Sequence, residues 1–385
     1  MALCRAMVLL ARQDGGPARG PGMDAEALYW LALNRLPVLG QPELRALVEG
    51  RASPVDIVAH RTPHMSSGSG GRAIPDWHAV DTDLRWLAIP GRHLITLSMS
   101  AYPDCLRQIP DPPPVLFVEG DVEVLSATQL AMVGSRRASP SGVETAHCFS
   151  AELANCGLAI TSGLALGVDA ASHRGAMAGG GRTLAVAANG LDIVYPRSHA
   201  RLARQVAENG ALVSEFSLGT APLARHFPRR NRLISGLSLG VVVVEAARRS
   251  GSLITARLAG EQGREVFAVP GPIQSPLAWG CHALIRQGAK LVEQVSDILE
   301  ELPGEQWQVP EKQAPERAIG SRDDLDTLHK RVLASLAHRA TSVDDLVERS
   351  GLTANTVCSI LLALELRGLV APVPGGAYCR VKKRQ

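Results

Sequence analysis

Gln129–Gly142, with the sequence QLAMVGSRRASPSG, is the stretch that decides the fold of this chain. Its apolar run, Gln129 to Val133, ends at Gly134, and a polar turn and a helical pattern follow. Residues 157–177, GLAITSGLALGVDAASHRGAM, repeat this order. Further segments with an apolar run that ends in a polar turn are residues 182–196 (RTLAVAANGLDIVYP), 210–216 (GALVSEF), 240–259 (GVVVVEAARRSGSLITARLA) and 264–271 (REVFAVPG). Short β-branched runs that alternate with helical segments predict an α/β fold, with a parallel sheet wrapped by helices.

The glycine turns of this repeat predict where a ligand would bind. In such sheets ligands bind at the carboxyl ends of the strands, which is where these turns fall. Each turn also opens a helix, whose unpaired N–H groups and dipole favour an anion. The repeat therefore predicts the binding of phosphate.

The length of 385 residues is enough for two or three domains. We expect the segments in chain order to be a disordered extension at 1–22, a helix-hairpin module with its linker at 23–75, the α/β core at 76–302, a linker at 303–321 and a winged-helix domain at 322–385.

The winged-helix prediction comes from three helical patterns followed by a hairpin pattern. Ser342 and Thr353 are placed as helix N-caps, and Gly351 lies in the turn between their helices. The would-be recognition helix, Thr353 to Leu366, has no Lys or Arg, and Glu365 is its only charged residue. A helix that reads duplex DNA normally brings donors for phosphates or bases. Contact with protein is therefore favoured over duplex reading, and both remain open.

Composition places the chain among globular proteins, with 46% hydrophobic and 20% charged residues. No apolar run reaches the roughly 18–20 residues that a membrane span needs. The seven cysteines show no CxxC pair and no spacing typical of metal ligands. We therefore expect a cytoplasmic protein without a metal site, a disulfide framework or a membrane anchor.

The net charge of +3 is unevenly distributed. Basic residues outnumber acidic ones within 131–299, whereas acidic residues outnumber basic ones in the rest of the chain. Most of these basic residues are arginines, but the chain prefers Arg to Lys throughout, so only the sign of the charge is informative.

The turn after the first strand of the repeat contains the candidate residues Gly134, Ser135 and Arg136. A glycine that lets the backbone approach closely, a hydroxyl donor and an arginine together fit an anion. The next glycine is Gly142, so the turn is not the GxGxxG of a dinucleotide site. A plain turn with solvated arginines remains the alternative.

The second turn contains the candidates Ser162, Gly163, Ala165 and Gly167. The glycines allow tight turns, and Ala165 is too small to fill a pocket. Asp169 is expected to cap the following helix. His173 lies one turn further on, and a hydrogen bond at the helix start is favoured over a catalytic Asp–His pair.

Two further clusters follow. Phe227, Arg230, Asn231 and Arg232 belong to the densest basic segment, and an aromatic ring beside arginines suits a single-stranded nucleic acid. A solvated charged face is the alternative. The second cluster, Ser250–Ser252 with Gly251 between the serines, can offer backbone and hydroxyl donors to an anion.

Catalytic signatures are few in this sequence. No GxxxxGK[ST] phosphate loop, GxSxG elbow, metal-ligand cluster or spaced pair of carboxylates is present. The sequence is thus rich in anion-binding groups and poor in catalytic ones.

Taken together, the motifs over residues 102–299 resemble the DNA-processing protein A family (DprA, also called Smf). The matching motifs are Tyr102-Pro103, Pro112–Phe117, Val133–Arg136, Ser162–Ala165 with Gly167, Asp169 and His173, Gly190–Asp192, Tyr195-Pro196, Ser214–Phe216, Phe227-Pro228, Arg230–Arg232, Val244–Ala246, Ser250–Ser252, Thr255-Ala256, Val269–Gly271 and Gly288-Ala289.

The resemblance implies a non-catalytic protein with an extended Rossmann-like core and no cofactor. It implies binding of single-stranded DNA, formation of a homodimer and loading of a RecA-type recombinase during natural transformation. By position, Gly134–Arg136 match the family's GSR turn, and Arg230–Arg232 match its RNR motif. Arg197 stands at the position of the basic residue that often follows Tyr-Pro in the family. His282 stands where many members have Asn.

A nucleotide-processing enzyme on a related sheet, such as a phosphoribohydrolase, is the alternative from another class. Such enzymes use a Gly-Gly-x-Gly-Thr turn before a helix that carries a catalytic Glu. This chain has Ser250-Gly251-Ser252 instead, which counts against that activity. Release of free base from nucleotides would distinguish the two.

Overall fold

A computed structural model describes residues 25–36, 41–61, 76–303, 327–336, 340–366, 368–373 and 376–381 of the chain. Residues 1–310 and 311–385 form two compact units. The extension predicted at 1–22 and nearly all of the linker predicted at 303–321 lie outside the described residues.

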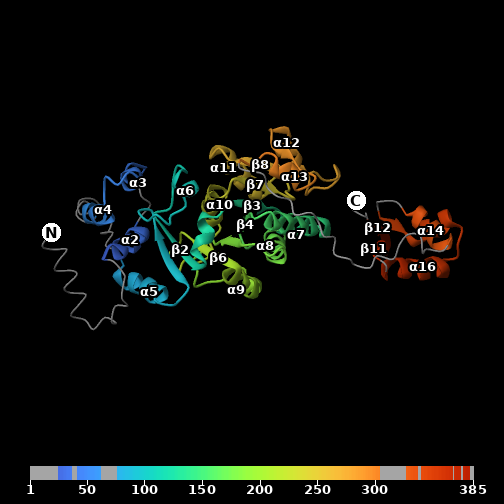
Figure 1. The fold of residues 1–385 in the computed structure, drawn as a ribbon, viewed down its shortest axis with the longest axis horizontal. Helices are drawn as coiled ribbons and strands as arrows, with labels where there is room; N and C mark the ends of the chain where they lie inside the picture. The colour runs from blue at the N-terminus through green and yellow to red at the C-terminus, as the bar shows by residue number, and fades with distance from the viewer. Residues whose placement is uncertain are drawn as a thin grey trace. The chain divides into compact units, whose positions relative to one another are not determined.

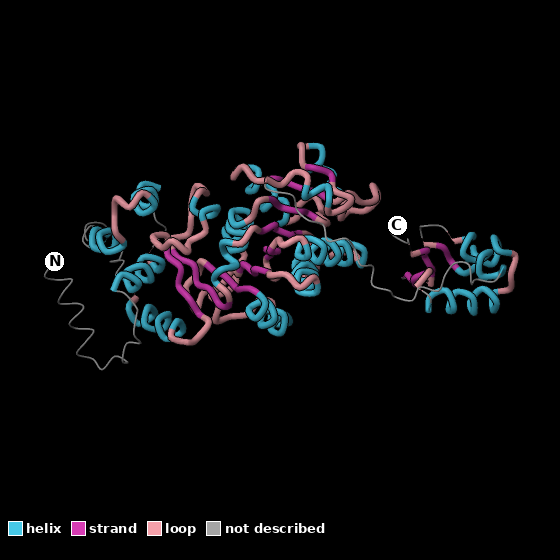
Figure 2. Tube along the Cα trace, in the orientation of Figure 1, coloured by secondary structure: helices cyan, strands magenta, loops and turns pink. Residues whose placement is uncertain are grey.

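The first unit is built on a nine-stranded sheet with the order β1-β2-β6-β5-β4-β3-β7-β8-β9 (Figures 1 and 2). Its strands are β1 Arg92–Thr96, β2 Val115–Gly120, β3 Gln129–Val133, β4 Ala159–Ser162, β5 Thr183–Val186, β6 Gly210–Ser214, β7 Gly240–Val243, β8 Glu265–Ala268 and β9 Lys290–Leu291. All neighbouring strands in the part of the sheet ordered β6-β5-β4-β3-β7-β8-β9 run parallel, which confirms the predicted parallel sheet. Strand β2 instead runs antiparallel to both β1 and β6, which the sequence patterns did not indicate.

The helices of this unit connect and cover the strands. They are α5 Trp77–Leu87, α6 Asp104–Arg107, α7 Pro140–Asn155, α8 Val168–Ala178, α9 Ala200–Asn209, α10 His226–Leu237, α11 Gly251–Glu261, α12 Trp279–Arg286 and α13 Ser296–Leu299, with the 3-10 turns η2 Val122–Ser126 and η3 Arg197–His199. Local signals start several of them: Ser139 caps α7 by accepting from the N–H of Gly142, and Pro140 occupies its first turn.

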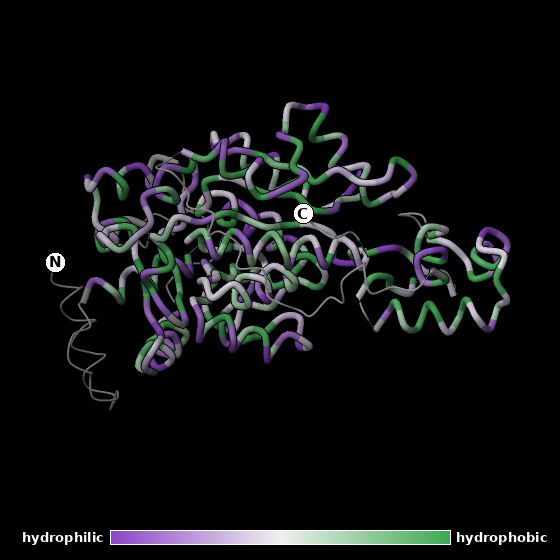
Figure 3. Tube along the Cα trace, turned by 45° about the vertical axis from the view of Figure 1, so that its right-hand side comes forward, coloured by the Kyte–Doolittle hydropathy of each residue, from purple (hydrophilic) through white to green (hydrophobic). Residues whose placement is uncertain are grey.

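Alternating side chains of the central strands build two cores, one on each face of the sheet. Leu130 and Met132 of β3 pack in the core formed with α7 and α8. Ala131 and Val133 belong to the other core, which includes apolar residues of α9, α10 and α11. Because side chains of a strand alternate between its faces, an unbroken apolar run such as Leu130–Val133 must be covered on both sides. Figure 3 shows the hydrophobic colouring of these central segments.

The N-terminal helices are part of the first unit's larger core. They are α2 Ala25–Arg35, α3 Gln41–Val48 and α4 Pro54–Arg61. Trp30, Leu31 and Leu33 of α2 are almost completely buried and share a core with Val80 and Trp86 of α5. The helices therefore pack as one body with the sheet.

The second unit has three helices and a small antiparallel sheet, as expected of a winged helix. Its elements are α14 Thr327–Ser335, β10 Thr341–Ser342, α15 Val343–Ser350, α16 Ala354–Leu366, β11 Val370–Val373 and β12 Ala377–Arg380. Ser342 caps α15, Gly351 ends it in the left-handed conformation at φ 64°, and the Thr353 hydroxyl accepts from the N–H of Thr356. The predicted caps and turn are confirmed.

Candidate nucleic-acid interface

The loops that follow β3, β4 and β5 surround a pocket at the carboxyl edge of the sheet, where the sequence predicted a site. Its walls come mainly from the turn after β4, the segment after β5, and α10. The lining residues are Arg136, Gly163–Leu166, Ala185, Ala187–Asn189, Leu191, Ile193–Pro196, Ala203, Leu212 and Phe227.

The pocket lining is largely apolar. Arg136 is its charged member, and none of the lining residues is a carboxylate, a histidine or a cysteine. An apolar cavity with one arginine suits a planar, weakly polar group whose attached phosphate remains outside. The geometry therefore favours a nucleobase over a phosphate as the occupant.

Three side chains form a platform at the pocket. The guanidinium carbon of Arg136 lies 4.9 Å from the centroid of the Phe227 ring. Tyr195, which is 44% exposed, meets the same ring edge-on at a centroid distance of 5.8 Å. Cation–π and edge-to-face contacts hold the three together and leave aromatic surface for a base. We call Arg136, Tyr195 and Phe227 the first platform.

Tyr195 was not among the candidates singled out in the sequence. It follows β5 by nine residues and so belongs to the same edge as the other turns. An exposed aromatic residue in such a turn could have signalled a stacking role.

Arg230 lies directly behind the turn after β4. It is 4% exposed, and its Nη1 donates to the carbonyl of Val186 at 3.1 Å. A Cβ added at Gly163 would lie 1.7 Å from that Nη1, so glycine at this position makes room for the guanidinium. Burial lowers the pKa of Arg230 to about 10, against the opposing effect of Asp169. Arg230 thus supports the pocket wall and is not on the exposed surface.

Asp169 uses the backbone donors of the same turn. Its Oδ2 accepts from the N–H groups of Gly163 at 3.1 Å and Ala165 at 3.3 Å. Burial raises the pKa of Asp169, and the nearby charge of Arg230 opposes that shift. The prediction that this turn binds phosphate is therefore wrong for the N–H groups of Gly163 and Ala165, because both donate to the carboxylate of Asp169.

The helix-start predictions also need correction. Gly167, with φ 74°, is the N-cap of α8, and Asp169 lies in its first turn. His173 shares no hydrogen bond with Asp169; its Nδ1 lies 2.7 Å from the Thr183 hydroxyl. Burial lowers the pKa of His173 to about 3, so the imidazole is neutral at ordinary pH.

The turn after β3 packs tightly against the start of α8. A Cβ on Gly134 would lie 2.6 Å from Val168, and one on Gly167 would lie 2.2 Å from the carbonyl oxygen of Ser135. The Ser135 hydroxyl accepts from the N–H of Arg137. This packing fixes the backbone that carries the exposed side chain of Arg136.

Most of the predicted basic cluster on α10 is paired internally. Glu215, whose side chain is 1% exposed, accepts from Arg232 at 2.5 Å and Arg229 at 2.9 Å. Arg232 also pairs with Asp111 at 3.0 Å. Asn231 donates to the carbonyl of Gly251 at 3.4 Å. Of this cluster, Phe227 lines the pocket and Arg230 contacts its wall, whereas Asn231 and Arg232 line no part of it.

The remaining candidates lie outside the pocket lining. Ser250 caps α11, and its hydroxyl is 2.7 Å from that of Ser252. Gly251 and Arg197 are exposed, and the Ser162 hydroxyl donates to the carbonyl of Met132 at 2.6 Å. Ser250–Ser252 and Arg197 follow strands of the sheet and stay candidates for contacts along the edge.

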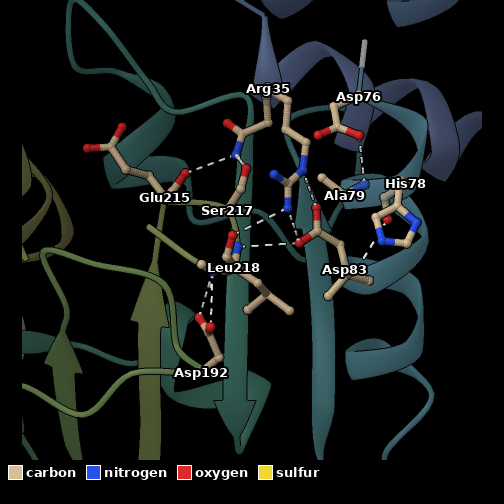
Figure 4. A network of polar contacts seen from close by, with 12 residues as sticks. Arg35, Asp76, His78, Ala79, Asp83, Asp192, Glu215, Ser217 and Leu218 are labelled. Atoms are coloured by element: carbon tan, nitrogen blue, oxygen red, sulfur yellow. Dashed lines mark hydrogen bonds and ion pairs between the residues drawn. The ribbon is translucent and has the colours of Figure 1, made fainter. Parts of the chain in front are cut away.

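A polar network joins the N-terminal helices to the loop between β6 and α10 (Figure 4). Arg35 of α2 donates two hydrogen bonds to the buried carboxylate of Asp83 in α5, at 2.7 and 2.8 Å. The same carboxylate accepts from the N–H of Leu218 at 3.3 Å. Asp192, which follows β5, accepts from the N–H of Gly219. The chain continues from this loop into α10, which carries Phe227.

No helix long and apolar enough to cross a membrane occurs in the part of the chain that the structure describes. Over those same residues, no cluster of three or more His, Cys, Asp or Glu is arranged to hold a metal ion.

Family models cover both units of the chain. Residues 93–303 match the model described as DNA recombination-mediator protein A, and residues 313–376 match that of the DprA winged helix domain.

Curated relatives agree with these matches. Protein Smf of Escherichia coli (strain K12) is 48% identical over 309 residues, which make up 79% of this chain and 82% of that protein. DNA processing protein DprA of Bacillus subtilis (strain 168) is 46% identical over 214 residues, or 55% of this chain and 72% of that protein.

Two solved structures are also similar. The X-ray structure of DNA processing protein A from Streptococcus pneumoniae aligns with a TM-score of 0.60 and 36% identity, covering 73% of this chain and 99% of that one. The structure of DNA processing protein A from Helicobacter pylori, reported for its single-stranded DNA binding mode, aligns with a TM-score of 0.50 and 28% identity. It covers 55% of this chain and 97% of that one.

Proposed function

The chain belongs to the DNA recombination-mediator protein A family, also called DprA or Smf, and from this premise we propose that it binds single-stranded DNA at the first platform. The observation that carries the proposal is the stack of half-buried Phe227 with exposed Arg136 and Tyr195 at an apolar pocket. Aromatic rings stack on bases without sequence preference, and arginine supplies the charge for phosphates.

Single strands are preferred to duplexes in this proposal. A base can enter the pocket or stack on the platform only when it is unpaired and free to leave its neighbours. Helix α16 contains no Lys or Arg, so it brings no positive charge to the major groove. We propose protein contact as the role of that helix.

The same site is proposed to be non-catalytic. Three acid or base side chains lie around the turn, and all three are buried and hydrogen-bonded. Asp169 accepts from Gly163 and Ala165. His173 shares a hydrogen bond with Thr183, and His199 shares one with the carbonyl of Leu164. The pocket itself offers no acid, base or nucleophile beyond the phenol of Tyr195.

A salt series tests the binding proposal. We expect tight binding of a thymidine oligonucleotide and binding at least tenfold weaker to a duplex of equal length. The affinity for the single strand should fall as salt rises, with a slope of about 0.7 per phosphate contact, because counterions are released. Fluorescence anisotropy at four salt concentrations measures both. Equal affinity for single strand and duplex at every salt concentration would contradict the proposal.

We further propose that the protein acts in the cytoplasm as a homodimer that loads a RecA-type recombinase onto single strands during natural transformation. The family description as a recombination mediator supports this role. Loading requires a protein-binding surface apart from the DNA site. The platform lies at one edge of the sheet, so the helices on its two faces leave such surfaces available. A dimer would present two linked DNA sites and raise the effective concentration on one strand.

Recombinase activity tests the loading role. On single strands precoated with single-strand-binding protein, we expect this protein to accelerate ATP hydrolysis by a RecA-type recombinase of the same organism. The physical reason is that a mediator holds bare DNA next to the incoming recombinase. Steady-state ATP hydrolysis with and without the protein measures the effect. An unchanged rate would leave a DNA-binding protein without a mediator role.

A further inference from the structure

A second stacked arginine and aromatic ring lies beyond the first platform. The guanidinium carbon of Arg248 lies 4.9 Å from the ring centroid of Trp279, which is 37% exposed. Three other Arg–aromatic stacks of the described residues use buried rings, those of Trp86, Tyr102 and Phe216. The rings of Phe227 and Trp279 are the more accessible ones, and both lie where strands of the sheet end.

Trp279 is held firmly although it does not fill a core. Its indole Nε1 donates to the carbonyl of Ile273 at 3.0 Å. The next residue, Gly280, donates to the carbonyl of Ala246 at 2.7 Å, and the N–H of Ala246 donates to Leu277 at the same distance. A Cβ on Gly280 would lie 2.6 Å from that Ala246 carbonyl oxygen. The segment is thus clamped to the residues that follow β7, and a ring fixed in this way loses little freedom when a ligand stacks on it.

The loop that carries Arg136 and the loop that carries Arg248 are directly linked. Strands β3 and β7 are paired neighbours, with Val133 opposite Val243. Glu245, just after β7, accepts from the N–H of Ser139 at 2.8 Å and from its hydroxyl at 2.6 Å. The loop that carries Arg136 is therefore tied to the loop that carries Arg248. Neighbouring strands are about 4.8 Å apart, so the two loops leave the same edge of the sheet next to each other.

Charge favours nucleic acid at this place. Arg248 and its neighbour Arg249 are exposed, and neither forms an ion pair within the described part of the chain. Free arginines beside an exposed indole repeat the chemistry of the first platform.

We propose that Arg248 and Trp279 form a second base-stacking site, which takes a later nucleotide of the strand bound at the first platform. This proposal rests on the proposed function. It adds a path for the bound DNA, which runs along the carboxyl edge of the sheet from the end of β3 past the end of β7. A base stacks on the indole of Trp279, while Arg248 and Arg249 contact phosphates.

A length series of oligonucleotides tests the second site in the full-length protein. Fluorescein-labelled thymidine oligonucleotides of about 4 to about 16 nucleotides cover the usual range of single-strand sites. On the shortest oligonucleotide that wild type binds, we expect Trp279→Ala to bind as tightly as wild type. On the longest it should bind roughly 10-fold more weakly, because one base loses its stacking partner. Trp279→Phe keeps a ring and should retain most of the wild-type gain in affinity with length.

Other outcomes separate the possible failures. Equal affinities of Trp279→Ala and wild type at every length would overturn the second site, and so would an equal loss at every length. Unchanged DNA binding together with a changed oligomeric state would assign Trp279 to a protein interface instead. Failure of wild type to bind any oligonucleotide would remove the proposed function itself.

Discussion

Replacing Arg136 by glutamate should weaken binding of single-stranded DNA on the order of 100-fold, about 2.8 kcal/mol. Arg136 is exposed, stacks on Phe227 and lines the pocket, so the substitution removes a phosphate contact and places a repelling charge there. The salt dependence should also become shallower by about 0.7 in its logarithmic slope, because one fewer counterion is released. Anisotropy titrations at several salt concentrations measure both quantities.

The matched control is Arg182→Glu. Arg182 directly precedes β5 and therefore lies at the opposite, amino edge of the sheet. Its side chain is 51% exposed and pairs with Asp121 at 3.3 Å. Exposed pairs contribute little to stability, so this variant should fold and bind within about threefold of wild type. If Arg182→Glu weakened binding as much as Arg136→Glu, the change in net charge would explain the loss of affinity, and the first platform would not be the site.

Arg230→Glu is no substitute for this test. The sequence placed Arg230 among the candidate DNA-binding residues, so reversing its charge would look like an equivalent test. In the structure Arg230 is buried next to Asp169, so a second carboxylate there would have no compensating charge. Such a variant is expected to destabilise the fold, and loss of DNA binding would then say nothing about contact.

Removing Asp83 should lower the free energy of unfolding of the first unit by about 3–5 kcal/mol. Asp83→Ala leaves the guanidinium of Arg35 and the N–H of Leu218 without the carboxylate that joins them. Removing one partner of a buried pair is costly because the other charge remains desolvated. All five tryptophans fall within residues 1–310, so denaturation followed by tryptophan fluorescence reports on this unit.

Two comparisons make the Asp83 result specific. The double variant Arg35→Met with Asp83→Leu should recover most of the lost stability, because apolar groups of similar size leave no unpaired charge. Asp81→Ala removes the exposed pair between Asp81 and Arg85 on the same helix and should cost under about 1 kcal/mol. A loss for Asp83→Ala no larger than that for Asp81→Ala would show that the network in Figure 4 does not hold the helices to the core.

The order of strands, turns and helices could be read from the sequence because each signal is local. A five-residue apolar run such as Gln129–Val133 predicts a strand buried on both faces, and a glycine after it predicts the turn. The same reasoning placed the candidate site at the carboxyl edge and named Arg136 and Phe227, which the structure brings together at one pocket. The caps at Ser342 and Thr353 were predictable for the same reason, since a cap involves residues only a few positions apart.

The tertiary structure alone decided what each charged side chain does. Arg229 and Arg232 both pair with Glu215, and Arg232 also pairs with Asp111. Arg230 passes behind Gly163, which lies 67 positions earlier in the numbering. Asp169 takes backbone donors that the sequence had assigned to a phosphate. A run of arginines looks the same in the sequence whether it faces water or a buried carboxylate. Its charge is available to a ligand only where the fold brings no counter-charge to it, and that depends on contacts between distant segments.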